Sequence, residues 1–266
     1  MIVLGISGAL NHDAAVSVIK DGEILFASHS ERYSKIKNDP LLNEEIIQEA
    51  LSYGKPDVIA WYEKPILKKF RQFTAGQFEL AFDLDELPMN YLKKFPELDG
   101  IKIKYQKHHY THAASGYFTS GFDDAAVVVI DSMGEYETLS IWEGNGDDLT
   151  QKYSQGYPNS VGLFYSAMTQ RLGLKPQEDE YILMGMAAYG NLHRRVNGKS
   201  LISHIYDEFK IILNNSNLEY YILVNFQKNL HRGCKWFLPE LTTEQDMFDL
   251  AAATQYVYEQ MLKSLP

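Results

Sequence analysis

The sequence has a single cysteine, Cys234, among 266 residues, so no internal disulfide can form within the chain. A chain without disulfides is typical of a reducing compartment, and we expect a cytoplasmic protein. No stretch approaches the ~20 apolar residues that a membrane span needs. The first residues, MIVLGISG, lack the basic and long apolar segments of a secretory signal peptide. We therefore expect a soluble protein that does not associate with a membrane.

Positive charge is also scarce, with 25 Lys and Arg against 35 Asp and Glu, which gives a formal net charge of −10. Nucleic-acid binders need clustered Lys and Arg to contact phosphates, and no long basic run exists here, so we expect no nucleic-acid partner. Apolar content of 45% and charged content of 23% are those of an ordinary globular protein. The length is compatible with one large domain or two lobes.

The stretch from His108 to Asp131 carries the strongest chemical signal. His108 and His112 are four residues apart in a segment of good helix formers, so their side chains should lie on one helix face. Asp131 ends the apolar run 125–130, which predicts a buried strand, and a carboxylate there should point into a cleft beyond the sheet. Two imidazoles and a carboxylate suit ferrous iron or zinc. The alternative is that the two histidines are a chance pair on an exposed surface.

Strand and hairpin signals occur twice along the chain. Residues 2–7 predict a strand, and the runs 14–19 and 23–27, joined by Asp21 and Gly22, predict a hairpin. Further strands are expected at 57–61, 101–105, 125–131, 138–142 and 149–153. Each half thus begins with a β-rich run, a loop containing Gly and Asp, and a hairpin, followed by helices. This pseudo-repeat predicts an α/β protein of two related lobes with a cleft between them.

Two polar segments of the first half have both a functional and an ordinary interpretation. The loop 7–13 contains Gly8, His12 and Asp13, and similar loops hold phosphate or substrate in nucleotide-binding folds, although it can also be a plain β-turn. The charged stretch 30–39, SERYSKIKND, is by default a solvated surface.

Helical periodicity follows at 42–51, 158–172 and 181–189. We expect the aromatic residues of 64–97 to pack in the core or in a lid, and Met184 and Met186 to pack in the core. Thr242 and Gln245 form a candidate capping box for a helix reaching about Ser264. That helix is amphipathic, so we expect it to need a sheet to lie on, yet no strand follows it in the sequence.

Three blocks, in order, resemble the NodU/CmcH-type O-carbamoyltransferase family. The first is MIVLGISGALNHDAAVSVIKDGEILFASHSERYSKIKND. The second is HHYTHAASGYFTSGFDDAAVVVIDSMGE, and the third is SVGLFYSAMTQRLGLKPQEDEYILMGMAAYG. They extend across almost the whole chain, and the charged stretch 31–39 falls on a signature position of the family.

The resemblance implies a two-lobed fold of the actin, sugar-kinase and Hsp70 ATPase class (RNase H-like), similar to Kae1. We expect residues 1–122 to form the first lobe and 123–266 the start of an incomplete second lobe. The implied activity is biosynthetic: transfer of a carbamoyl group from carbamoyl-adenylate, itself made from ATP and carbamoyl phosphate by a YrdC-like domain, to a hydroxyl of a small-molecule acceptor.

The resemblance also implies site residues. His108, His112 and Asp131 match the family's metal positions, with iron as the implied ion and zinc as the alternative. His12 and Asp13 match its active-site His-Asp pair, in which His12 either acts as a base or orients a ligand. We expect Gly8, Ser132 and Gly134 to contact the nucleotide.

The sequence departs from the family pattern in two ways. Asn38, Lys35 and Ile182 replace the usual histidine, arginine and lysine, which puts a phosphate contact at 182 in doubt. Family members are also much longer, so we expect the C-terminal part, including the YrdC-like domain, to be missing.

Three functions therefore remain open. The chain is the N-terminal part of an O-carbamoyltransferase, or a non-catalytic binding protein of the same fold, or, less in keeping with two imidazoles at the cleft, an ATP-dependent kinase. The second option implies a partner chain or a homodimer that covers the final helix.

Overall fold

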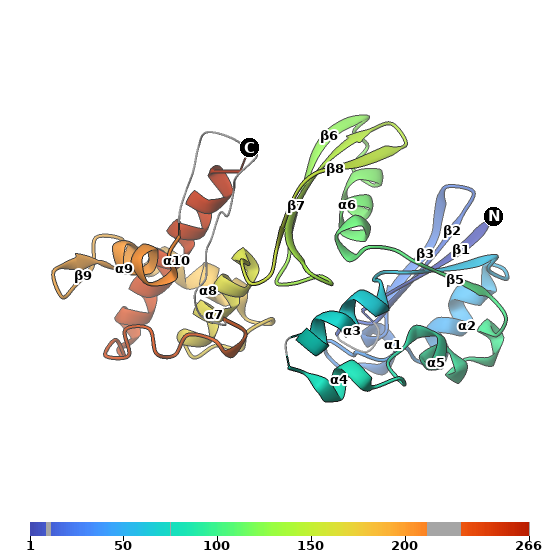
Figure 1. Cartoon of the computed structure of the whole chain (residues 1–266), viewed down its shortest axis with the longest axis horizontal. Helices are drawn as coiled ribbons and strands as arrows, with labels where there is room; N and C mark the ends of the chain where they lie inside the picture. The colour runs from blue at the N-terminus through green and yellow to red at the C-terminus, as the bar shows by residue number, and fades with distance from the viewer. Residues whose placement is uncertain (9–11, 75, 212–229, 266) are drawn as a thin grey trace. The chain divides into compact units, whose positions relative to one another are not determined.

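The computed structural model describes residues 1–8, 12–74, 76–211 and 230–265, and it divides into two compact units (Figure 1). The first unit is Met1–Ser115 and the second is Gly116–Pro266. The division falls inside helix α6 (His108–Phe118), which therefore contributes residues to both units.

A five-stranded sheet forms the centre of the first unit, with the order β3-β2-β1-β4-β5. Its strands are β1 (Ile2–Ser7), β2 (Ala15–Lys20), β3 (Glu23–His29), β4 (Val58–Trp61) and β5 (Lys102–Tyr105). β1, β2 and β3 are antiparallel, whereas β4 and β5 run parallel to β1. Asp21 and Gly22 both have positive φ, at 50° and 91°, as a two-residue hairpin turn requires. The five strands predicted for this half are confirmed.

The core of the first unit lies between this sheet and its helices. Asn43 caps α2 (Glu44–Ser52) by accepting from the Ile46 amide at 3.0 Å, and Ile46, Ile47 and Ala50 are buried against the sheet. The other helical segments are α1 (Glu31–Ser34), α3 (Pro65–Thr74), α4 (Phe78–Phe82), α5 (Pro88–Tyr91), η1 (Leu92–Lys94) and η2 (Pro96–Leu98).

Of the six aromatic residues of 64–97, which we expect in the core or in a lid, two lie in the core and four do not; a lid formed by those four stays a prediction. Tyr91 and Phe95 are buried. The phenylalanines of α3 and α4 are exposed, namely Phe70, Phe73, Phe78 and Phe82. Met184 is likewise exposed rather than in the core, because it lies on the outer side of α8.

The sheet of the second unit is an antiparallel meander in the order β6-β7-β8. Its strands are β6 (Asp124–Ile130), β7 (Glu137–Asn145) and β8 (Asp148–Gly156), so the predicted repeat of strand, turn and hairpin is confirmed. Tyr117, at the end of α6, donates from its hydroxyl to the Asp123 carbonyl at 2.5 Å and contributes to the attachment of α6 to this sheet.

Helices complete the second unit. They are α7 (Val161–Arg171), α8 (Glu180–Met186), η3 (Ala187–Tyr189), α9 (Leu201–Phe209), η5 (Leu230–Arg232) and α10 (Glu244–Lys263), with the short strands β9 (Arg195–Val196) and β10 (Lys199–Ser200). The buried side of α10, including Leu250, Val257 and Met261, belongs to one core with α7, α8 and α9. The expectation that this helix needs a sheet is therefore wrong, because neighbouring helices cover its apolar side.

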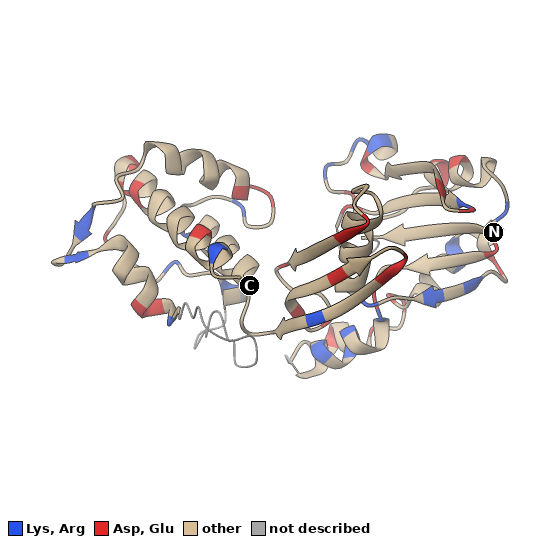
Figure 2. Ribbon diagram, turned by 90° about the horizontal axis from the view of Figure 1, so that it is seen from above, with Lys and Arg blue, Asp and Glu red and all other residues tan. Residues whose placement is uncertain are grey.

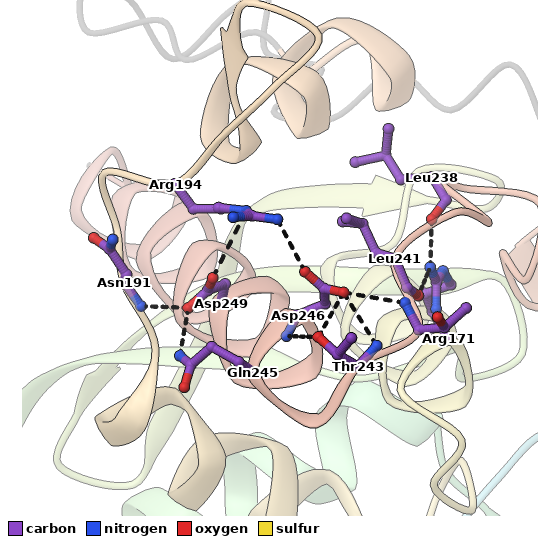
Figure 3. Close-up of polar contacts among 10 residues, drawn as sticks. Arg171, Asn191, Arg194, Leu238, Leu241, Thr243, Gln245, Asp246 and Asp249 are labelled. Atoms are coloured by element: carbon purple, nitrogen blue, oxygen red, sulfur yellow. Dashed lines mark hydrogen bonds and ion pairs between the residues drawn. The ribbon is translucent and has the colours of Figure 1, made fainter.

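Polar contacts fix the start of α10 and attach it to the loop between η3 and β9 (Figure 3). Arg194 pairs with Asp246 at 3.2 Å, and the amide of Asn191 donates to Asp249 at 2.7 Å. Thr243 and Asp246 form the capping box of the helix, one residue later than the predicted Thr242 and Gln245. Both threonines are followed three positions later by a side chain that can complete a capping box, Gln245 after Thr242 and Asp246 after Thr243. The sequence alone therefore does not decide which threonine caps the helix.

Arg171, at the end of α7, forms hydrogen bonds with the segment 237–241, which leads into α10 (Figure 3). Its guanidinium donates to three carbonyl oxygens, those of Phe237 at 2.5 Å, Leu238 at 2.5 Å and Leu241 at 3.0 Å. Burial lowers the pKa of this guanidinium. One side chain therefore satisfies several main-chain acceptors of a segment without regular structure.

Acidic and basic residues are interspersed along the chain (Figure 2). Among the described residues, no helix combines the length and the apolar character that a bilayer span requires.

Candidate metal centre

The two histidines of α6 meet at its first turn. His108 Nε2 and His112 Nε2 lie 3.0 Å apart, as the spacing of four residues on one helix face predicted. His108 is half-buried and His112 is exposed. Tyr62, whose role is not evident from the sequence, supports the pair in two ways. Its ring packs edge-on against His108, with ring centroids 5.6 Å apart, and its carbonyl accepts from the Thr111 hydroxyl at 3.2 Å.

The distance between the two Nε2 atoms fits simultaneous coordination of one ion. Metal–imidazole bonds of about 2.1 Å place two nitrogen ligands about 3.0 Å apart at a 90° angle and about 3.4 Å apart at a tetrahedral angle. The observed 3.0 Å lies at the octahedral end of that range. Without an ion, the same geometry requires one imidazole to donate its Nε2 proton to the other. Neutral imidazoles are the usual protein ligands of zinc and iron, so the pair is suited to a metal.

Asp131 is held rigidly at the end of β6 in the second unit. Its amide donates to the Thr138 carbonyl at 3.0 Å, and its Oδ1 accepts from the Ser132 amide at 2.6 Å. The carboxylate is half-exposed, with one oxygen engaged by the backbone in this way. The expected position of Asp131, directly after a strand, is confirmed.

The start of α7 packs directly on the turn that contains Asp131. Ser160, the N-cap residue of α7, donates its hydroxyl to the Ser132 carbonyl at 2.7 Å and also approaches the Asp131 carbonyl at 3.2 Å. A Cβ atom on Gly162 would lie 2.7 Å from the Asp131 carbonyl oxygen. Ser160 and Gly162 therefore fix the backbone that carries the carboxylate. Neither residue stands out in the sequence as part of the site.

Ser132 and Gly134 lie in the same turn as Asp131. The Gly134 amide donates to the Glu137 carbonyl at 2.8 Å and closes the turn, and Gly134 is buried whereas Ser132 is half-buried. Ser132 is therefore more accessible to a ligand than Gly134. Their expected contact with a nucleotide stays a prediction.

His12 and Asp13 form the expected pair after β1. His12 Nδ1 lies 3.0 Å from Asp13 Oδ2, and both side chains are accessible, at 70% and 41% exposed. Gly8 has a φ of 70°, and its carbonyl accepts from the His12 amide at 3.2 Å. A Cβ atom at this position would collide with the carbonyl groups of His12 and Asp13, so the turn requires glycine here. The middle of the loop, residues 9–11, lies outside the described residues.

The charged stretch 30–39 supports this loop rather than forming only a solvated surface. The carbonyl of Asp39 accepts from the Ala14 amide at 2.8 Å, and the carbonyl of Asn38 accepts from the Asp13 amide at 3.4 Å. Glu31 holds the other side of the stretch, because its Oε2 accepts from the Asn38 amide at 3.1 Å. The stretch therefore positions Asp13 and Ala14, which directly follow His12, through main-chain atoms.

Within each unit, the predicted site residues are close neighbours in space. The first unit brings together His108 with His112, and His12 with Asp13. The second unit brings Asp131 into one turn with Ser132 and Gly134. Coordination of a single ion by residues of both units stays a prediction.

Comparison with known proteins identifies the family. A family profile described as the carbamoyltransferase N-terminus matches residues 60–265. An uncharacterized protein of Synechocystis sp. is 31% identical over 99% of this chain and 47% of its own length. The nodulation protein NolNO of Sinorhizobium fredii is 26% identical over 98% of this chain and 41% of its own length. The chain thus spans less than half the length of these curated relatives.

Similarity to solved structures is weaker. A Ppx/GppA family protein of Aquifex aeolicus aligns with 99% of this chain and 90% of its own at 13% identity, with a TM-score of 0.31, too low to support an argument about the fold. The family profile and the relatives together show that the chain belongs to the NodU-type carbamoyltransferase family and corresponds to its N-terminal region.

Proposed function

We propose that this chain is the N-terminal part of an enzyme that transfers a carbamoyl group from carbamoyl-adenylate to a hydroxyl group of a small-molecule acceptor. Membership of the carbamoyltransferase family supports the transferred group. We further propose that the two units are lobes of a Kae1-like fold of the actin and Hsp70 ATPase class. The remaining segments of the longer relatives would then supply the rest of the second lobe and the domain that makes the adenylate.

The single observation that supports this function best is the 3.0 Å approach of His108 Nε2 and His112 Nε2. Together with Asp131 they would complete a set of two imidazoles and one carboxylate, which is typical of ferrous iron sites and also accepts zinc. When bound, a divalent ion would supply Lewis-acid stabilisation of negative charge on the phosphate or the carbamoyl oxygen. The contacts that fix Tyr62, Ser160 and the Asp131 turn would keep these side chains oriented.

His12 is the proposed general base. With Nδ1 facing the Asp13 carboxylate at 3.0 Å, the Nδ1 proton is donated to Asp13, and Nε2 keeps a lone pair that can accept a proton. As the acceptor oxygen attacks the carbamoyl carbon, its proton passes to His12 Nε2. The new C–O bond forms while the bond between the carbamoyl group and the phosphate oxygen breaks, and AMP leaves with that electron pair.

Gly8, Ser132 and Gly134 are the proposed nucleotide contacts. Gly8 opens the loop before His12 and has a positive φ, a conformation in which main-chain amides can approach a phosphate. Ser132 offers a half-exposed hydroxyl beside Asp131.

Metal analysis tests the site directly. The protein is reconstituted anaerobically with Fe(II) and, separately, with Zn(II), and its metal content is then measured by mass spectrometry after desalting. We expect about one ion per chain in the wild type and loss of the ion in His112→Ala and Asp131→Asn. The matched control is His193→Ala, another exposed histidine that lies outside the site. Unchanged metal content in His112→Ala would refute the assignment.

A transfer assay tests the reaction itself, using the protein together with the adenylate-forming activity. Labelled carbamoyl phosphate and ATP are supplied with a hydroxyl acceptor, and both AMP and labelled product are measured. We expect His12→Ala to lower product formation by about 100-fold or more with metal content unchanged. Phosphorylation of the acceptor from ATP alone, without carbamoyl phosphate, would instead support a kinase.

A further inference from the structure

Strand β6 lies at one edge of its sheet but has the composition of a central strand (Figure 1). After Asp124 it consists of the uncharged apolar run AAVVVI. Such runs are typical of strands that have a neighbour on both sides. The opposite edge, β8, is mostly polar, contains Asp148 and Lys152, and pairs with β7 through shifts of register. Charges and bulges of this kind are what natural edge strands use against further pairing, and β6 has almost none of them.

The hydrogen-bond pattern shows which main-chain groups of β6 face away from β7. The Gly146 amide donates to the Asp123 carbonyl at 2.8 Å, and the Asp131 amide donates to the Thr138 carbonyl at 3.0 Å. Both pairs continue the register of β6 with β7, so the odd-numbered residues of β6 direct their N–H and C=O groups toward β7. The even-numbered residues therefore direct theirs toward the open edge. These are Asp124, Ala126, Val128 and Ile130.

The open edge of β6 is accessible to another strand. Among residues 1–8, 12–74, 76–211 and 230–265, no strand pairs with this side of β6. Val128, in the middle of the strand, is 44% exposed, and Ala126 is exposed as well. A strand added here would satisfy the outward N–H and C=O groups and cover the Val128 side chain at the same time.

The first unit shows what occupies the equivalent edge. Both units contain a strand followed by a hairpin, with antiparallel pairing throughout: β1-β2-β3 in the first and β6-β7-β8 in the second. The other side of β1 pairs with β4 in parallel, with Leu4 opposite Ile59, and Leu4 is fully buried. In the part of the chain that the structure describes, β6 lacks the parallel neighbour that β1 has.

Chain order indicates the source of such a neighbour. In the first unit α2 lies between the β2-β3 hairpin and β4, as the crossover to a parallel strand requires. In the second unit the helices α7 to α10 follow the β7-β8 hairpin, so the equivalent of β4 would come after α10. The matching family profile is described as an N-terminus and extends to residue 265, and this chain matches only 47% of the length of the Synechocystis relative. The remaining polypeptide of the family is therefore the source that fits.

We propose that the β6 edge binds a strand from the C-terminal part of the carbamoyltransferase polypeptide, running parallel to β6 and bonded to Ala126, Val128 and Ile130. The inference rests on the proposed function in one respect, that the chain works as the N-terminal part of a longer enzyme. The added strand is a short run rich in β-branched residues and free of proline, because it becomes an inner strand of the sheet. None of the proposed metal or base residues takes part.

Paired proline variants test the open edge in the chain itself. Val128→Pro removes an N–H that faces the open edge, so it should keep the wild-type circular dichroism spectrum and lower the melting temperature by less than about 5 °C. Val127→Pro removes an N–H that faces β7 and should lower the melting temperature by about 10 °C or more. Equal losses would show that the Val128 N–H is already paired, which overturns the proposal.

Hydrogen exchange measured by NMR tests the partner. The part of the Synechocystis relative that lies beyond its match to this chain is joined after Pro266. Covalent attachment gives an effective concentration of about 1 mM, so even a weak strand contact should form. We expect exchange at the amides of Ala126, Val128 and Ile130 to slow by at least about 100-fold relative to residues 1–266 alone. Exchange at Val127 and Val129, which already face β7, should change little.

Two variants of the joined protein and one measurement on the chain alone complete the test. Val128→Pro should abolish the protection at Ala126 and Ile130. His112→Ala should keep that protection while losing the metal, so failure of the metal assignment is distinguishable from failure of this proposal. Sedimentation velocity of residues 1–266 alone should show a monomer at about 10 µM. Absence of protection in the joined protein, protection that survives Val128→Pro, or a dimer of the chain alone that Val128→Pro dissociates would each overturn the proposal.

Discussion

Replacing Gly162 by alanine should destabilise the protein, although alanine is normally the better helix former. Gly162 is the second residue of α7, and its missing Cβ leaves room for the Asp131–Ser132 backbone. A Cβ atom would lie 2.7 Å from the Asp131 carbonyl oxygen and 2.8 Å from both the Asp131 carbonyl carbon and the Ser132 nitrogen. These are main-chain atoms, so they cannot rotate out of the way as a flexible side chain could.

Two opposing contributions determine the size of the effect. Alanine gains up to about 1 kcal/mol over glycine from helix propensity. Relieving the contacts needs a shift of about 0.6 Å in α7 or the turn, and overpacking of this kind costs about 1–3 kcal/mol. Ser160 opposes the shift, because its hydroxyl bonds to the same turn. We expect a net loss of about 1–2 kcal/mol, which corresponds to a fall in melting temperature of about 3–6 °C for a chain of this size.

Thermal and urea unfolding, followed by circular dichroism, provide the assay. The matched control is Gly185→Ala in α8, where an added Cβ meets nothing within 4 Å, so this variant should gain up to about 1 kcal/mol. The two alanine variants should therefore move the unfolding midpoint in opposite directions. If Gly162→Ala stabilises the protein as Gly185→Ala does, the close packing of α7 on the Asp131 turn is refuted.

Two further predictions concern the contacts around α10. Arg171→Met leaves the carbonyl groups of Phe237, Leu238 and Leu241 without their donor and should lower the unfolding free energy by about 2–4 kcal/mol, measured by urea denaturation. Lys175→Met, which removes an exposed ion pair, should cost less than about 0.5 kcal/mol, and equal losses would contradict the role given to Arg171. The hydrogen bond from the Thr243 hydroxyl lowers the pKa of the Asp246 carboxyl below its ordinary value. The ionised Asp246 carboxylate therefore stabilises the fold above about pH 4, and this stabilisation disappears as the pH falls through the lowered pKa. The unfolding free energy of the wild type should exceed that of Asp246→Ala by about 1 kcal/mol at pH 7. Urea titrations should show this difference shrinking steadily below pH 4, and a constant difference down to pH 2 would refute the stabilising role of the carboxylate.

Features that depend on local sequence were predictable. The strands follow from short runs of apolar and β-branched residues, and the hairpin at Asp21 and Gly22 follows from the turn chemistry of those two residues. The approach of His108 and His112 follows from helix geometry alone. In each case the signal lies within a few residues of the feature, so no knowledge of the tertiary structure was needed.

Features set by tertiary contacts were missed. The periodicity of α3 predicts an apolar stripe but not its direction, which depends on the partners of Lys68 and Lys69. The support that 30–39 gives to Asp13 and Ala14 comes from main-chain carbonyls of Asn38 and Asp39, and every residue has such a carbonyl. The role of Gly162 depends on a turn about thirty positions earlier in the chain. A sequence pattern contains no record of contacts of this kind.

The edge strand β5 bears on how the protein behaves in concentrated solution. An edge strand offers unpaired main-chain groups that can recruit strands of other molecules into a growing fibril. Lys102 and Lys104 are exposed on β5, and charged lysines along an edge oppose such strand-by-strand growth. The lysines of β5 therefore disfavour aggregation through this edge of the sheet when the protein is concentrated.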